Sequence, residues 1–262
     1  MQLDLSFFDT YELRHFELGV YPLTAKIASR QDLARLRETP PHRHIGRFQW
    51  AKLRRHQQSV HFHVESSPYF DPGLNKLPLP LHIEGYWQSE KYFLDCRRIL
   101  LAELSPKLPL EPENAAIANK ISSTDSISLH VRRGDYASNE VVNRVHGIVP
   151  LDYYRRAVSL LEARLANPHI FVFSDDHEWV QENLHFSAPM TFVKTNNSDR
   201  GFRDIQLQSM CRHHITANSS FSWWGAWLNP RRDKVVIAPT HWLADAAGDD
   251  SRDRVPESWL RM

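Results

Sequence analysis

Hydrophobic and polar positions change their pattern along the chain, and the change falls near residues 119–124. Before this point prolines interrupt the apolar runs, most densely at residues 40–41 and 77–81, so regular elements there must be short. After it, short apolar runs alternate with amphipathic stretches, a pattern typical of a parallel sheet whose strands are connected by helices. We therefore predict an α/β protein with two domains, at residues 1–122 and 123–262.

The second part of the chain carries the clearer elements. Five apolar runs predict strands at residues 126–131, 169–173, 190–193, 214–217 and 234–238. Between the first two, apolar side chains recur with helical spacing from Tyr154 to Leu165, and Pro168 ends the predicted helix. Further helices are predicted after residue 176, at residues 204–211 and after residue 219.

The first part yields fewer elements. Residues 3–7 predict a strand, and alternating histidine and apolar residues predict another at 61–64. A helix is predicted at residues 90–104, where apolar side chains from Phe93 to Leu104 recur at three-to-four spacing. No catalytic motif is visible in this part.

Composition bears on which ligands the protein can bind and on its cellular compartment. Lys and Arg number 32 and Asp and Glu 31, so the net charge of +1 provides no general attraction for nucleic acid. Cys96 and Cys211 are far apart and the 15 histidines are scattered, which predicts neither a disulfide framework nor a metal site. Without an apolar run of membrane-spanning length or a leader after Met1, we expect a cytoplasmic protein, with peripheral contact at the inner membrane left open.

Two arginines follow the first predicted strand of the second domain, in the stretch His130-Val131-Arg132-Arg133-Gly134-Asp135-Tyr136. Ligands of parallel sheets bind beyond the carboxyl ends of the strands, and arginine can hold a phosphate bidentately. Gly134 permits a tight turn there. An exposed, salt-bridged turn is the structural alternative, but the position after a strand favours phosphate binding.

Two other strand ends carry polar residues. Asp175 and Asp176 close the next strand, and they predict either a helix N-cap, with Glu178 completing a capping box, or acceptors for a guanine edge or a ribose. Residues 216–227 run from hydroxyl-rich positions into a tryptophan-rich helix, so that serine hydroxyls and helix N–H groups can bind phosphate while the tryptophans pack in the core. No P-loop, G-x-G-x-x-G fingerprint or D-x-D metal clamp is present, which favours metal-independent chemistry with arginine in place of a cation.

These three segments together resemble the bacterial α1,2-fucosyltransferases of glycosyltransferase family 11, whose hallmark is the H-V-R-R-G-D-Y stretch. Further segments that look like the family, in the same order, lie at residues 3–6, 11–18, 86–93, 146–147, 219–228 and 255–259. The resemblance implies a GT-B-like fold of two Rossmann-like domains, the N-terminal one on the acceptor side. It also implies GDP-β-L-fucose as donor, inversion at the anomeric carbon, no metal or other cofactor, and the 2-hydroxyl of a terminal galactoside of a surface glycan or lipopolysaccharide as acceptor.

By the same resemblance, His130 would lie near guanine, Arg132 would contact the β-phosphate and Asp176 would hold the guanine or the ribose. Arg133 would bind the donor or form a structural pair with a carboxylate. The full set of expected donor-binding residues is His130, Arg132, Arg133, Asp175, Asp176, Asn218, Ser219, Ser220 and Phe221.

The residues expected to be catalytic are Arg132, which offsets the charge of the departing diphosphate, and a base that deprotonates the acceptor hydroxyl. Asp135 is the first candidate for the base. Glu140 aligns with the catalytic glutamate of the similar α1,6-fucosyltransferases, and His146 is a third candidate. Each of the three could instead be structural.

The family normally begins with a strand and a G-G-L-G-N-Q type loop, and this sequence starts after them. We therefore expect a truncated N-terminal domain and a donor site that lacks part of its wall. The alternative function is a degenerate relative that binds a nucleotide sugar or a glycan without turnover. An arginine-rich RNA-binding module is disfavoured, because neither the charge nor an RNP-like motif supports it.

Overall fold

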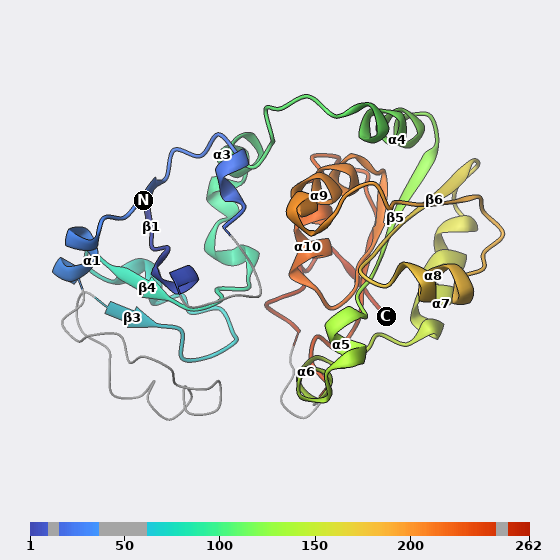
Figure 1. The fold of residues 1–262 in the computed structure, drawn as a ribbon. Coiled ribbons are helices and arrows are strands. Elements are labelled where there is room, and N and C mark those ends of the chain that lie inside the picture. Colours follow the sequence, from blue (N-terminus) through green and yellow to red (C-terminus); the bar gives the residue numbers. More distant parts are fainter. Residues whose placement is uncertain (10–15, 37–61, 245–250) are drawn as a thin grey trace. The chain divides into compact units, whose positions relative to one another are not determined.

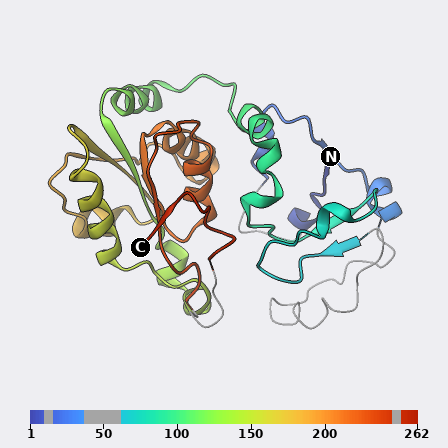
Figure 2. The ribbon, with the colours of Figure 1, turned by 180° about the vertical axis from the view of Figure 1, so that it is seen from behind.

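The computed structural model describes residues 1–9, 16–36, 62–244 and 251–262. These residues form two compact units, Met1–Ile99 and Leu100–Met262, and each is described separately (Figures 1 and 2). The predicted domain division between residues 122 and 123 stays a prediction. Among the described residues, no helix has both the length and the apolar character needed to cross a membrane.

The first unit is built from short elements, as its prolines predict. Strand β1 pairs in parallel with β2, and β3 pairs in parallel with β4. The elements are β1 Gln2–Leu3, η1 Ser6–Asp9, η2 Leu18–Val20, β2 Lys26–Ile27, α1 Arg30–Leu36, β3 Phe62–Val64, η3 Leu74–Lys76, β4 His82–Glu84, η4 Glu90–Tyr92, η5 Leu94–Cys96 and α3 Arg97–Glu103, the last of which continues into the second unit. The strand expected at 61–64 is β3, and residue 61 lies outside the described residues.

Two predictions for this unit are wrong. The strand expected at residues 3–7 ends at Leu3, because the Asp4 carboxylate accepts the N–H of Ser6 at 2.9 Å and a 3-10 turn follows. The helix expected at residues 90–104 is interrupted at Phe93, whose φ of −142° is not helical. A local side-chain hydrogen bond therefore ends the first segment, and a non-helical residue interrupts the apolar periodicity of the second.

The second unit contains a six-stranded, entirely parallel sheet with the order β10-β9-β8-β5-β6-β7. Five of its strands lie within the predicted runs or within one residue of them, and the two-residue β10 was not predicted. The strands are β5 Asp125–Val131, β6 Pro168–Ser174, β7 Met190–Phe192, β8 His213–Ile215, β9 Val236–Ala238 and β10 Leu260–Arg261. Numbered within this unit, the order is 6-5-4-1-2-3, which is that of a doubly wound Rossmann sheet.

Helices connect these strands. The predicted helices are present as α7, α8, α9 and α10, whereas α4, α5 and α6 were not predicted. Their bounds are α4 Pro112–Ser122, α5 Gly134–Ser138, α6 Glu140–His146, α7 Leu151–Glu162, α8 His177–Asn183, the 3-10 turn η6 Ser198–Arg200, α9 Gly201–Met210 and α10 Ser220–Trp227.

Both faces of the sheet are covered, because successive side chains of β6 point into two different cores. Ile170 and Val172 point into a core that includes buried residues of α7 and α8, whereas Phe171 and Phe173 point into a second core with Leu207 of α9. In Figure 1, α7 and α8 accordingly lie on one side of β5 and β6 and α9 on the other, and Figure 2 shows the same arrangement from behind. The central strands are therefore inaccessible except at their ends.

A buried arginine joins α9 to the segment that leads into α4. Arg203 is 1% exposed, and its guanidinium donates to the carbonyls of Leu108 and Pro109 at 3.1 and 2.7 Å. Its Nε lies 3.1 Å from the Glu111 carboxylate, which balances the buried charge. The guanidinium thus holds a stretch without regular structure against the core.

We expect Arg203→Met to lower the free energy of unfolding by about 1–3 kcal/mol, because it removes the buried guanidinium that donates to the carbonyls of Leu108 and Pro109. Chemical denaturation measures this directly. Arg200→Met is the matched control: Arg200 lies 3.9 Å from the same carboxylate but its side chain is 54% exposed, so a change below about 0.5 kcal/mol is expected. Equal losses in the two variants would contradict the assignment.

Candidate functional site

The point where the chain reverses its direction across the sheet lies between β5 and β8. From β5 the chain continues to β6 on one side, and from β8 it continues to β9 on the other. Ligands of doubly wound sheets bind beyond the carboxyl ends of the strands at this point. The segments that follow β5 and β8 begin at Arg132 and Thr216, so two of the three predicted segments meet there. The third, at Asp175, follows the neighbouring strand β6.

Arg132 is held between two carboxylates. The register of β5 and β6 pairs Val131 with Ser174, so the next residues of the two strands, Arg132 and Asp175, face each other. The Arg132 guanidinium lies 2.8 Å from Asp175 Oδ2 through Nη1 and 2.6 Å from Asp135 Oδ1 through Nη2. The side chain remains 21% exposed, so a bound anion can still reach this oriented guanidinium.

Arg133 points toward α8 instead. Its Nε lies 3.3 Å from Asp176 Oδ2, and its guanidinium lies 4.0 Å from the centroid of the Trp179 ring. The expected pair with a carboxylate is therefore present. Donor binding by Arg133 stays a prediction.

The two aspartates have different roles. Asp176 is the N-cap of α8 and accepts the N–H of Trp179 at 3.1 Å. The helix N-cap expected of one of the two aspartates is therefore confirmed at Asp176, whereas Asp175 accepts the N–H of Arg133 through Oδ1 at 2.8 Å. The Asp175 carboxylate thus bonds to the segment after β5, whereas that of Asp176 bonds to its own helix.

Gly134 is needed for close approach at this turn. A Cβ atom there would lie 2.7 Å from Asp175 Oδ2 and 3.0 Å from its Cγ. Any larger residue would therefore displace the carboxylate that orients Arg132.

His130 lies at the end of β5 and is 4% exposed. Burial lowers its pKa to about 4, the Asp175 carboxylate opposes this shift, and Arg132 adds to it. Its ring centroid is 5.4 Å from that of Phe221, at the start of α10, and its Nδ1 has no hydrogen-bond partner among the described residues. A neutral imidazole thus connects the arginine turn to α10.

The N-terminus of α10 is capped by Ser219, whose side chain accepts the N–H of Phe221 at 3.3 Å. Ser222 Oγ accepts the N–H of Ala217 at 3.2 Å and stabilises the turn. Ser220 is exposed, so its hydroxyl is available to a ligand. As predicted, tryptophans of this helix pack in the core, Trp223 and Trp227 being buried.

Three other predicted residues lie around the same end of the sheet. Asn218 is 3% exposed and donates to the carbonyls of His146 and Trp242 at 2.7 and 3.2 Å. The His146 ring stacks on Tyr136 with centroids 4.8 Å apart. Glu140 begins α6, with a side chain that is 90% exposed and lies 3.6 Å from Arg144.

Two aromatic residues of the site were not assigned a role from the sequence. Trp179 supports Arg133, and the Tyr136 ring lies 5.3 Å from the Arg132 guanidinium. The position of Trp179 three residues after Asp176 gives helical spacing, but its contact with Arg133 depends on how α8 packs on the sheet. No group of three or more His, Cys, Asp or Glu side chains that could hold a metal ion occurs in the described part of the chain.

The doubly wound sheet, the arginine turn at its reversal point and the exposed start of α10 define an α/β protein whose site is suited to an anionic ligand such as a nucleoside diphosphate. The model of Glycosyl transferase family 11 matches residues 52–261. The chain belongs to this family.

Named relatives agree with this assignment. An Escherichia coli alpha-1,2-colitosyltransferase is 37% identical over 182 residues, which are 68% of this chain and 61% of the relative. The Escherichia coli O-antigen biosynthesis glycosyltransferase WbnK is 39% identical over 142 residues, 53% of this chain and 45% of the relative. The human galactoside alpha-(1,2)-fucosyltransferase 1 is 33% identical over 104 residues, 39% of this chain and 28% of the relative. The matched region therefore spans between about a quarter and three fifths of these relatives.

We expect the His130 imidazole to titrate with a midpoint of about 4, since burial disfavours its charged form. Because this pKa lies below the unfolded value of about 6.5, the stability associated with a neutral His130 is complete above pH 6.5 and is lost as the pH falls toward 4. Histidine NMR, with the resonance assigned by His130→Gln, measures the midpoint. A value near 6.5 would show that the ring is solvated.

Proposed function

We propose that this chain carries the donor site of an inverting glycosyltransferase, which moves L-fucose from GDP-β-L-fucose to the 2-hydroxyl of a terminal galactoside of a surface glycan or lipopolysaccharide. The observation that carries the proposal is the Arg132 guanidinium, which lies at the reversal point of the sheet and is oriented by carboxylates at 2.8 and 2.6 Å. Family membership supports the class of reaction. The proposal includes a GT-B-like arrangement, in which the N-terminal part of the protein contributes the acceptor side.

In the proposed mechanism, Arg132 donates to the β-phosphate and offsets the charge that develops as GDP leaves. The exposed Ser220 hydroxyl and the N–H groups at the start of α10 add further donors. The neutral His130 imidazole can bind an uncharged guanine base, and Asp176 can accept from the base or the ribose. No metal is required, because protein donors supply the positive charge.

For the base we propose Glu140 rather than Asp135. In an inverting displacement, the acceptor hydroxyl attacks the face of the sugar opposite the departing diphosphate. Asp135 is bound at 2.6 Å to the guanidinium that holds this diphosphate, which places it on the leaving-group side. Glu140 keeps a 90% exposed side chain that can accept a proton. His146, the third candidate, packs against Tyr136.

The donor sugar has a second candidate. The relative named as a colitosyltransferase is 37% identical to this chain, so GDP-colitose is an alternative to GDP-fucose. A transfer assay with both donors and lactose as acceptor distinguishes them. Binding of GDP without transfer of either sugar would instead favour a nucleotide-sugar-binding relative without turnover.

We expect Arg132→Ala to raise the Kd for GDP about 10- to 100-fold, because it removes charge-assisted hydrogen bonds. Arg132→Lys should retain part of the affinity, since it keeps the charge without the planar fork. Isothermal titration calorimetry gives both values. The control is Arg231→Ala, an arginine with a 46% exposed side chain paired with Asp233, which should leave the Kd unchanged. Unchanged GDP affinity in Arg132→Ala would refute the donor site.

Substitutions of Glu140 and Asp135 should have different effects, one on the rate of transfer and the other on GDP binding. We expect Glu140→Gln to lower kcat by about 100- to 10,000-fold with little change in GDP affinity. Asp135→Asn should mainly weaken GDP binding, because Arg132 loses one of the groups that orient it. Steady-state kinetics and calorimetry on the same preparations test this pattern, and the reverse pattern would make Asp135 the base.

A further inference from the structure

A lysine follows β7 at the same end of the sheet as the arginine turn. β5 ends beside Ser174 of β6, and Val172 of β6 pairs with Phe192 of β7. The ladder continues past this pair, because the N–H of Val193 donates to the Val172 carbonyl at 2.9 Å. The next residue, Lys194, therefore lies beside Ser174, two strands from the end of β5, or roughly 10 Å.

Helix α8 contacts a cation from each of the strands that flank β6. On the β5 side, the Trp179 ring and Asp176 hold the Arg133 guanidinium. On the β7 side, Gln181 Oε1 accepts a hydrogen bond from Lys194 Nζ at 2.7 Å. Lys194 is exposed, and no carboxylate of the described residues pairs with it. Since an ammonium has three N–H donors, two remain for a ligand.

The loop that carries Lys194 is fixed by a pair of amides. Asn196 Nδ2 donates to Asp204 of α9 at 2.6 Å and to Asn114 of α4 at 3.1 Å. Asn114, which is 1% exposed, returns a hydrogen bond to Asn196 Oδ1 at 2.9 Å. The main chain at Lys194 is therefore held by the β7 ladder on one side and by this amide pair two residues later.

The charge of Lys194 acts on the same histidine as the charges of the aspartates after β6. Burial lowers the pKa of His177, the Lys194 ammonium lowers it further, and the two aspartates oppose the shift. The side chain of one of them, Asp176, is 30% exposed. A ligand at the ends of β6 and β7 thus meets a carboxylate and an ammonium on neighbouring strands.

This pair of charges matches one edge of guanine. The O6 atom is an acceptor and lies next to the N1–H and N2–H donors, so an ammonium can donate to O6 while a carboxylate accepts from the donors. Adenine presents the opposite pattern, with an amino group in place of O6 and an acceptor at N1. A phosphate would match the ammonium, but the carboxylate would repel it. The charge pattern therefore favours guanine.

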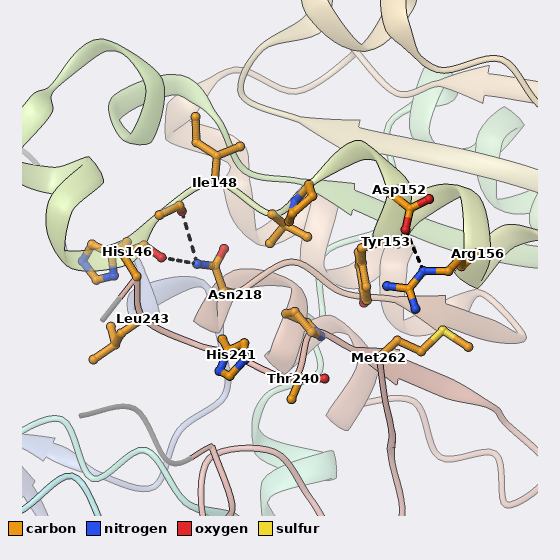
Figure 3. A pocket seen from close by; sticks show the side chains of 15 residues that line it. His146, Ile148, Asp152, Tyr153, Arg156, Asn218, Thr240, His241, Leu243 and Met262 are labelled. Carbon is orange, nitrogen blue, oxygen red and sulfur yellow. Dashed lines mark hydrogen bonds and ion pairs between the residues drawn. The ribbon is translucent and has the colours of Figure 1, made fainter. Parts of the chain in front are cut away.

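The other side of the arginine turn offers no such cation. A cavity of about 450 Å³ lies there, at the carboxyl ends of β8 and β9 (Figure 3). Among the described residues that line it, the one arginine, Arg156, pairs with Asp152 at 2.9 Å. A nucleoside that extends from the arginine turn therefore meets an available cation only toward β7.

We propose that Lys194 binds guanine O6 and selects the base of the nucleotide, with Gln181 directing its ammonium. The assignment rests on the proposed function for the presence of a nucleotide at this end of the sheet. It adds a residue that selects the base, whereas Arg132 acts on the phosphates of any nucleoside diphosphate.

Lys194→Met tests the proposal. We expect the Kd values for GDP and for inosine diphosphate to rise about tenfold, because both bases carry O6. The Kd for ADP should not change, so the preference for GDP over ADP falls by the same factor. Lys194→Arg should keep most of the GDP affinity, since a guanidinium also donates to O6. Isothermal titration calorimetry gives the Kd of the two O6 nucleotides, and ligand-observed NMR that of the weaker ADP.

Lys120→Met is the matched control, because it removes another exposed lysine whose partner is a neutral side chain of β7, the Thr191 hydroxyl at 2.9 Å. It should leave all three Kd values unchanged. Unchanged GDP affinity in Lys194→Met would overturn the assignment, as would an equal loss for ADP, which would show that Lys194 binds phosphate. Both results leave the donor site in place, whereas a wild-type chain that does not bind GDP would refute the donor site and this assignment together.

Discussion

The Asp175 carboxylate is the contact on which the site depends. One of its oxygens accepts the main-chain N–H of Arg133 and the other pairs with the Arg132 guanidinium, each at 2.8 Å. The same carboxylate thereby joins the ends of β5 and β6 and orients the Arg132 guanidinium. Gly134 leaves the space that this carboxylate occupies. The rest of the proposed donor site, from His130 to the start of α10, lies around these two contacts of Asp175.

The sheet of the second unit could be predicted because its strands are buried on both faces. β6 reads as a continuous apolar run, with Phe171 and Phe173 on one face and Ile170 and Val172 on the other, and such a run leaves little choice of structure. Helices α5 and α6 were missed because they are short, with five and seven residues. Asn139 separates them, ending one and capping the next by accepting the N–H groups of Val141 and Val142.

The residue types of the site could also be predicted, but most of their partners could not. Arg132 and Asp175 stand more than forty positions apart, and only the register of β5 and β6 brings them face to face. The same holds for Asn218, which was expected to bind the donor and whose amide is found joining the loops at His146 and Trp242. Position after a strand predicts that a residue belongs to the site. Which neighbour the residue contacts depends on tertiary packing, which cannot be predicted from the nearby sequence.

The stacking of Arg133 on Trp179 has a practical consequence. The indole lies 4.0 Å from the guanidinium, and the same arginine is held by Asp176 at the edge of the proposed nucleotide site. Any ligand that draws the guanidinium away from the ring changes the electrostatic environment of that indole, and hence its emission. Trp179 is thus an intrinsic fluorescent reporter of this site, and replacing it with phenylalanine would separate its signal from that of the other seven tryptophans.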